Sequence, residues 1–299
     1  MSLLVVGSIA LDTVETPFGS VVDALGGSAT YFSLAAGLFG EVRLVGVVGE
    51  DFPEDYRRIL AGRGIDTAGL VTRPGRTFRW TGAYKGAMNE AETLAVELNV
   101  FGDFNPDLPE EYRDSGFVFL ANGLPSVQKA VLRQVPDARL VVCDTMNYYI
   151  ENALDDLRDL LTEVDALVLN DQEARMLTGV DSLVRAGRII LTMGPTFVVI
   201  KKGEHGALLV ARDGVAALPA YPTGEVKDPT GAGDSFAGGM MGSIAASGDF
   251  SFEGIKRAMG YGTAVASLTV EGFGTEALRA ASRQDVEGRV RQLREMLRF

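Results

Sequence analysis

Short runs of apolar, largely β-branched residues alternate along this chain with stretches of helical period. Strands that are apolar on both faces and separated by helices are typical of a parallel sheet covered by helices on both sides. The pattern predicts helices over 28–40 and 50–64 and an extended segment over 65–73. Residues 207–221 predict a hairpin that turns at Asp213-Gly214. Strands are predicted at 3–7, 42–49, 117–122, 138–144, 165–170 and 196–203.

Residues 73–103 have a different pattern, in which apolar side chains alternate with polar ones. This alternation predicts antiparallel strands, and with residues 13–26 they are expected to form a small sheet outside the main layers. Such a sheet is either a lid over the carboxyl edge of the parallel sheet or an oligomerisation surface, and the two roles are compatible. We therefore expect an α/β core over 1–12, 27–72 and 104–299, with a β lid over 13–26 and 73–103. Three aromatic residues of the predicted lid have two possible roles: they line a binding site, or they pack only against the sheet. They are Phe78, Trp80 and Tyr84.

Composition narrows the class of protein. The 299 residues carry 28 basic and 40 acidic side chains, a net charge of −12, which disfavours nucleic acid and anionic membranes as partners. One cysteine, Cys143, excludes an internal disulfide, and one histidine, His205, excludes a two-histidine metal site. No apolar run approaches the roughly 18 residues of a membrane span, and the first residues lack a signal peptide's basic front. A cytoplasmic location is expected.

Residues 228–239, Asp-Pro-Thr-Gly-Ala-Gly-Asp-Ser-Phe-Ala-Gly-Gly, are the most informative stretch. A turn and a Gly-Ala-Gly loop lead into a predicted helix that extends to Ser247. The first N–H groups of a helix lack partners and can cradle an anion. A carboxylate beside that cradle, Asp234, repels anions, but it makes sense if it takes a proton next to a transferring phosphoryl group. The alternative is a glycine-rich turn with a capping aspartate.

A second motif lies near the N-terminus. It consists of a Gly26-Gly27 pair, a predicted helix of small residues and the stretch VGVVGEDFPEDYRRILAGRGID. Together they resemble the ribokinase-like (PfkB) family of carbohydrate kinases over nearly the whole chain. The resemblance implies a three-layer α/β/α sandwich with a mostly parallel central sheet and a small β-sheet lid. It also implies an ATP- and Mg²⁺-dependent phosphotransferase that moves the γ-phosphoryl group to a hydroxyl of a sugar or sugar-like polyol.

The resemblance assigns residues on the phosphate side. It makes Asp234 the catalytic base and the backbone of Gly231, Ala232 and Gly233 the anion hole. Asn170 and Glu173 match an Asn-x-x-Glu motif that arranges Mg²⁺, its waters and the phosphates, although Glu173 also suits a helix's first turn. The nucleotide-binding residues after the next strand are Lys201, with Lys202 as the alternative, and Gly203.

On the acceptor side, the resemblance implies that Asp12 accepts hydrogen bonds from the substrate hydroxyls. Gly26 and Gly27 would let the substrate approach the backbone. The family commonly has Asn where this chain has Tyr31, so specificity for ribose or fructose does not carry over.

Some members of the family bind a monovalent cation beside the anion hole. The matching positions suit K⁺ and include carbonyls at a predicted strand turn; they are Asp228, Thr230, Ser267, Val270 and Gly272.

Residues 272–277 also match a dinucleotide fingerprint, but the 22 residues that follow are too few for its roughly 30-residue unit. Three classes of function stay open: a sugar or polyol kinase, a nucleoside kinase on the same fold, and a non-catalytic ligand sensor. The intact Asp234 and Gly-Ala-Gly loop argue against the sensor. The edge of the lid sheet could pair across a two-fold axis, which would make the protein a homodimer.

Overall fold

The computed structural model of the protein describes residues 2–298. Within them, nine strands form a large sheet in the order β13-β12-β11-β10-β9-β8-β1-β4-β5. The strands from β11 to β5 are parallel, and β12 and β13 add an antiparallel hairpin at one edge. All the strands predicted from apolar runs are confirmed. They are β1 (Leu3–Val6), β4 (Val42–Gly49), β5 (Ile65–Arg73), β8 (Phe117–Leu120), β9 (Leu140–Asp144), β10 (Ala166–Asn170), β11 (Phe197–Lys201), β12 (Ala207–Ala211) and β13 (Gly214–Leu218).

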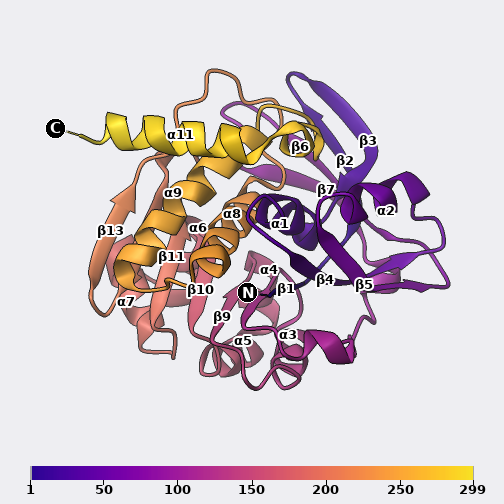
Figure 1. The fold of residues 1–299 in the computed structure, drawn as a ribbon, viewed down its shortest axis with the longest axis horizontal. Helices are drawn as coiled ribbons and strands as arrows, with labels where there is room; N and C mark the ends of the chain where they lie inside the picture. The colour runs from indigo at the N-terminus through magenta and orange to yellow at the C-terminus, as the bar shows by residue number, and fades with distance from the viewer. Residues whose placement is uncertain (1, 299) are drawn as a thin grey trace.

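Helices cover both faces of this sheet (Figure 1), which confirms the predicted three-layer α/β/α sandwich. Alternate residues of β1 face the two layers: Leu3 and Val5 pack into one core, Leu4 and Val6 into the other. One layer holds α1 (Ser28–Ala36), α2 (Glu54–Ala61), α8 (Ala232–Ser247), α9 (Phe252–Thr269), α10 (Glu276–Ala280) and α11 (Arg283–Met296). The other holds α3 (Pro125–Leu132), α4 (Asn147–Asn152), α5 (Leu154–Leu161), α6 (Asp171–Thr178) and α7 (Leu183–Leu191).

The second sheet is the small one expected outside the main layers. It has the order β3-β2-β6-β7, and Figure 1 shows it at the upper right of the molecule. Its strands are β2 (Ala10–Thr16), β3 (Gly19–Gly26), β6 (Phe78–Tyr84) and β7 (Ala91–Glu97). Strand β2 pairs in parallel with β6, so that Asp12 lies opposite Trp80 and belongs to the small sheet. The division of the whole chain into core and lid stays a prediction.

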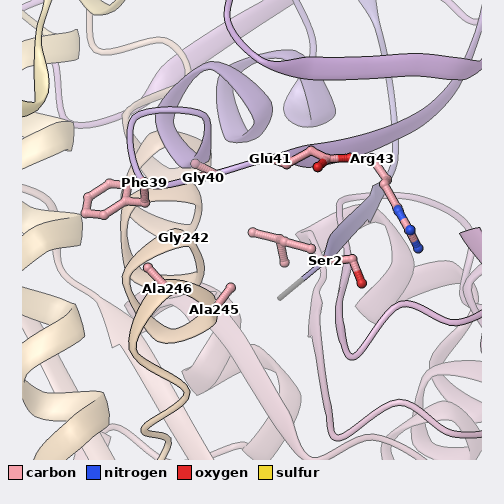
Figure 2. Close-up of a pocket in the computed structure, with 10 residues that line it drawn as sticks. Ser2, Phe39, Gly40, Glu41, Arg43, Gly242, Ala245 and Ala246 are labelled. Atoms are coloured by element: carbon pink, nitrogen blue, oxygen red, sulfur yellow. The ribbon is translucent and has the colours of Figure 1, made fainter.

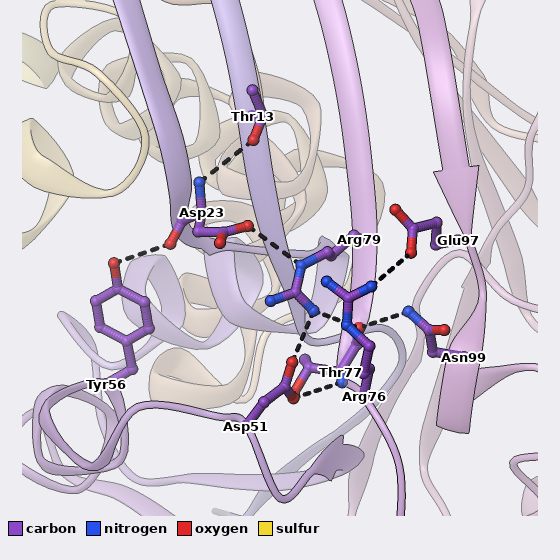
Figure 3. A network of polar contacts seen from close by, with 9 residues as sticks. All are labelled: Thr13, Asp23, Asp51, Tyr56, Arg76, Thr77, Arg79, Glu97 and Asn99. Atoms are coloured by element: carbon purple, nitrogen blue, oxygen red, sulfur yellow. Dashed lines mark hydrogen bonds and ion pairs between the residues drawn. The ribbon is translucent and has the colours of Figure 1, made fainter.

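The base of the small sheet is tied to the core by charged groups (Figure 3). Arg79 in β6 donates hydrogen bonds to Asp51, 2.7 Å away, and to Asp23, 3.2 Å away. Asp51, which follows β4, also accepts two bonds of 2.7 Å from the N–H and hydroxyl of Thr77. Burial opposes ionisation of Asp51, but the hydrogen bonds from Arg79 and Thr77 lower its pKa overall. One end of the small sheet is therefore firmly anchored.

One predicted element is wrong: Ser267 and Val270 do not lie at a strand turn. Helix α9 runs through Ser267 to Thr269, and Val270 is its C-cap. Glycines allow this helix to lie close against α8, because a Cβ on Gly262 would approach the carbonyl oxygen of Phe236 to 2.6 Å. Close packing against α8 therefore outweighs the low helix propensity of glycine in this stretch.

Candidate active site

The predicted anion cradle lies at the start of α8, in the helical layer that packs on one face of the large sheet. Gly231 is the N-cap and has a left-handed backbone, φ +73°, which favours glycine. The helical ladder begins where the N–H of Ser235 donates to the carbonyl of Gly231 at 2.8 Å. The N–H groups of Gly233 and Asp234 precede that bond, so no backbone carbonyl of the helix accepts from them. This is the arrangement that binds anions at helix N-termini. The N–H of Asp234 donates to its own carboxylate.

Asp228 fixes the loop before the cradle. It is 1% exposed, and its two carboxylate oxygens accept from the backbone N–H groups of Thr230, at 2.9 Å, and Gly274, at 2.8 Å. The carbonyl of Val270, another residue predicted for a monovalent cation, accepts from the N–H groups of Lys227, at 2.8 Å, and Asp228, at 3.3 Å. These oxygens hold the loop against the end of α9.

A lysine and three carboxylates surround the cradle. The Nζ of Lys201, at the end of β11, lies 3.2 Å from Oδ2 of Asp144, at the end of β9. A Cβ placed on Gly233 would lie 3.2 Å from the same Nζ, so the ammonium group borders the cradle. Parallel strands bring these residues together because their carboxyl ends meet at one edge of the sheet.

Burial sets the protonation of these groups. Burial raises the pKa of Asp234 to about 7; the Asp144 carboxylate adds to the rise, and the Lys201 ammonium opposes it. Burial lowers the pKa of Lys201, but the carboxylates of Asp144, Glu173 and Asp234 more than offset this, so its pKa is raised. Lys201 is therefore charged at neutral pH, while Asp234 is poised between its two forms, as a general base requires.

Asn170 and Glu173 form a reciprocal cap at the start of α6. The N–H of Glu173 donates to the Asn170 side chain at 2.8 Å, and Oε2 of Glu173 accepts from the N–H of Asn170 at 2.7 Å. The structural role considered for Glu173 is thus present. Its carboxylate also faces the site: burial, then the Asp144 carboxylate, raises the pKa of Glu173 to about 7, and Lys201 opposes that rise.

Asp12, which was predicted to bind the acceptor hydroxyls, is 5% exposed. Burial raises the pKa of Asp12 to about 7, while a hydrogen bond from the Gly27 N–H opposes the rise. A Cβ on Gly26 would meet Oδ2 of Asp12 at 1.8 Å, and one on Gly27, where φ is +95°, would meet the carbonyl oxygen of Ser8 at 2.5 Å. The glycine pair therefore leaves room for Asp12 and for the chain's own backbone, rather than only for a ligand.

Two tyrosines complete this side. Tyr31 is 1% exposed, its hydroxyl has no hydrogen-bond partner among the described residues, and its ring lies 2.3 Å from where a Cβ on Gly231 would be. Tyr31 thus lies directly against the phosphate loop. Tyr84, the last residue of β6, places its hydroxyl 3.3 Å from that of Thr230. The small sheet is in contact with the loop at this point.

A cavity of about 780 Å³ extends from the cradle along the end of β11. It is bordered by Ala232, Gly233, Lys201, Asn170 and the loop 202–207, and also by residues 87–90 of the small sheet. Its volume suits a nucleotide, since small-molecule sites measure about 300–1,000 Å³. A second cavity of about 210 Å³ lies among Ser2, Phe39, Arg43 and Ala246, where Figure 2 shows none of the predicted site residues.

Sequence reasoning missed Asp144. The stretch LVVCD was interpreted through its cysteine, which is buried as expected. A carboxylate that directly ends an otherwise apolar parallel strand was the signal that could have found it. The ammonium group of Lys201 borders the cradle, and both Lys201 and Lys202 border the cavity, so their roles toward a nucleotide stay predictions.

No cluster of three or more metal-ligating side chains within residues 2–298 is arranged to hold a metal ion by itself. Mg²⁺ typically keeps several waters and uses one or two carboxylates with substrate phosphates, so the carboxylates beside the cradle fit it. None of the helices in the same part of the chain has the length and apolar character that crossing a membrane requires.

An anion cradle, a charged lysine and a carboxyl group of near-neutral pKa are the parts of a phosphoryl-transfer site. Residues 2–281 match the family model described as pfkB family carbohydrate kinase, and the chain belongs to that family of kinases.

Similar proteins agree with this assignment. A cytidine kinase from Thermococcus kodakarensis is 33% identical over 251 residues, which cover 81% of this chain and 87% of the relative. The fold matches a Burkholderia thailandensis nucleoside kinase solved with inosine, with a TM-score of 0.80, 21% identity and 97% of each chain covered. It also matches a structure described as ribokinase II from E. coli, solved with ATP and Mg²⁺ (TM-score 0.80, 19% identity, 97% of this chain and 99% of that one covered). The ribokinase-like fold that the sequence implied is confirmed.

Proposed function

We propose that this protein transfers the γ-phosphoryl group of ATP to a hydroxyl of a nucleoside or sugar, with Asp234 as the general base. The observation that carries the proposal is the Asp234 carboxyl group in the first turn of α8, beside the N–H groups that precede the helical ladder. Burial raises the pKa of this carboxyl group to about 7. Asp234 would accept the proton of the attacking hydroxyl, and the N–H groups of the cradle would offset the charge on the transferring group.

The other residues have separate tasks in this proposal. Lys201, held by Asp144, would contact the nucleotide phosphates, and Asp12 would accept hydrogen bonds from acceptor hydroxyls. Mg²⁺, when bound with ATP, neutralises phosphate charge, and Glu173 would hold it through water with Asn170 fixing the carboxylate. Asn170 also borders the 780 Å³ cavity.

The relationship to a cytidine kinase favours a nucleoside as the acceptor, while the sugar or polyol reading of the sequence remains the second candidate. The ring of Tyr31 packs against Gly231. Its position therefore neither adds an aromatic wall to the acceptor pocket nor excludes a nucleobase from it.

The test is turnover of Mg–ATP by the purified protein with cytidine, uridine, adenosine, inosine, ribose, fructose and inositol, each product being identified by mass spectrometry. We expect a phosphorylated nucleoside first and a parallel loss of activity in Asp234→Asn. Absence of any phosphorylated product, with nucleotide bound and the protein folded, would contradict the proposal.

A monovalent cation is not required by this proposal. Both carboxylate oxygens of Asp228 and the carbonyl of Val270 already accept backbone hydrogen bonds, so these donors fit K⁺ less well than the sequence implied. Comparing rates in potassium and in Tris buffers of equal ionic strength tests the point. A tenfold or larger activation by K⁺ would support the predicted monovalent-cation site.

A homodimer through the small sheet is a further part of the proposal. Its exposed apolar side chains support a pairing surface, since exposed apolar patches mark interfaces; they are Val22, Leu94, Val96 and Leu98. Light scattering of the purified protein would show a mass near 64 kDa, twice the 31.9 kDa of one chain, if the dimer forms.

A further inference from the structure

The turn between β6 and β7, residues 85–90, reaches across the site to the nucleotide side. Strand β6 ends at Tyr84, whose hydroxyl meets Thr230, and the chain then turns through Gly86 at φ +58°. Residues 85–87, 89 and 90 are exposed, but Met88 between them is only 8% exposed. An apolar side chain is therefore buried at the tip of an exposed turn, where it borders the 780 Å³ cavity.

The backbone of Met88 is held in an unfavourable conformation. Its φ is +55°, which non-glycine residues adopt uncommonly. Such backbone strain persists only where surrounding contacts fix it, and it concentrates at ligand sites. Two side-chain contacts fix this turn.

Both contacts pair an amide with a carboxylate on opposite sides of the cavity. Nδ2 of Asn89 donates to Oε1 of Glu204, in the loop after β11, at 3.1 Å. Nε2 of Gln172, in the first turn of α6, donates to the carboxylate of Glu90. The turn is thus attached to the two core segments that border the cavity on its far side, next to Lys201 and Asn170.

A ligand that starts at the cradle and fills this cavity contacts the turn, because residues 87–90 and the loop 202–207 both border the cavity. We propose that Met88 contacts the nucleotide, and that the Asn89–Glu204 bond positions it, so that the small sheet is part of the nucleotide site as well as the cover of the acceptor. This inference rests on the proposed function, since it assigns further residues to the same site.

The consequence is that nucleotide affinity depends on the small sheet even without an acceptor. A cover for the acceptor alone would leave nucleotide binding to the core residues. Binding of Mg–AMP-PNP, a non-hydrolysable ATP analogue, to the acceptor-free protein therefore separates the two arrangements.

The experiment is calorimetric titration of the full-length protein with Mg–AMP-PNP. We expect Met88→Ala to weaken binding about five- to tenfold, and Asn89→Ala and Glu204→Gln to weaken it about threefold each. The matched control is Lys85→Gln in the same turn: that side chain is 77% exposed, pairs with Glu92 at 2.7 Å and does not border the cavity. It should bind like the wild type.

Equal affinity, within twofold, for Met88→Ala, Asn89→Ala and the wild type would overturn this inference and leave the proposed function standing. No binding by the folded wild type would overturn both. Thermal melts accompany each titration; a variant that melts earlier but binds normally counts against the inference, because a purely structural contact behaves that way. If Met88→Ala does not fold, Asn89→Ala and Glu204→Gln decide the question, since both change exposed side chains.

Discussion

The two sides of the site are built differently. The core side places Asp144, Lys201, Glu173 and Asp234 at the ends of parallel strands and in first helical turns, and burial and neighbouring charge shift the pKa values of the last three. The side formed by the small sheet contributes one carboxyl group of raised pKa, Asp12, and meets the core beside the site through hydrogen bonds of the neutral side chains of Tyr84 and Asn89. We therefore expect proton transfer and charge stabilisation to depend mainly on the core, and nucleotide affinity to depend also on the small sheet.

Replacing Asp234, the proposed base, should have the largest effect on turnover. Asp234→Asn is expected to lower turnover roughly 10²–10⁴-fold, because the amide cannot accept the hydroxyl proton. Affinity for Mg–AMP-PNP should be kept, since the backbone cradle is unchanged. Steady-state kinetics and calorimetry on the same preparation measure both. Near-parental turnover would mean that another group is the base.

Loss of the ion pair between Asp144 and Lys201 should have the next largest effect on activity. Asp144→Asn is expected to lower kcat/KM for ATP about 10–100-fold, because a charge-assisted hydrogen bond is lost and the ammonium is free to leave the cradle. Lys201→Met should have a similar effect. The double variant should be little worse than either single one, because both remove the same contact. Additive losses would show that Asp144 acts independently of Lys201.

The pH dependence of the reaction should reflect the buried carboxyl groups of the site and not the turn 85–90. Since the pKa of Asp234 is about 7, its base form is lost as pH falls, and kcat/KM should decline about tenfold per unit below that value. Neighbouring carboxyls titrate in the same range, so the apparent value belongs to the cluster. A Met88→Ala variant should show the same profile. A flat profile between pH 5 and 8 would contradict the assignment of the base.

The anchor at the base of the small sheet should affect stability more than chemistry. Arg79→Met leaves Asp51 and Asp23 without their guanidinium, which should lower the free energy of unfolding by about 2 kcal/mol. The value of kcat at saturating substrate should change less than twofold. Denaturant melts and initial rates test this. The exposed Arg76→Met, which loses one bond to Glu97, serves as the control.

The smallest effect is a gain in stability in the inactive variant. The folded-state pKa of Asp234, about 7, exceeds the ordinary aspartate value of 3.8, so the unfolded chain ionises first as pH rises. Stability is therefore lost between about pH 4 and pH 7 and is not regained above that range. Asp234→Asn escapes this loss and should gain about 1 kcal/mol at pH 8, or roughly 2–4 °C, with no gain near pH 4. Equal melting temperatures at pH 8 would argue that the carboxylate is not desolvated.

Much of the fold follows from local pattern. Apolar runs such as 165–170 predict β10 within a residue, and the alternation at 78–84 predicts a separate small sheet. The Asp228–Gly239 motif predicts the cradle because capping and glycine conformation are local properties. Asp144 was missed because its importance depends on Lys201, which lies 57 residues further along the chain. The contacts of the turn 85–90 with Glu204 and Gln172 depend on how two sheets meet, which no local pattern encodes.

Tyr31 couples the choice of acceptor to the geometry of the loop at Gly231. Its ring supports Gly231 from below, so helix α1 and the phosphate loop share one contact surface. An engineer who enlarges or shrinks residue 31 to admit a new acceptor would therefore also displace the N–H donors of the cradle, which we propose bind phosphate. Directed evolution of acceptor choice should therefore produce paired changes at positions 31 and 231, or else proceed through positions elsewhere in the molecule.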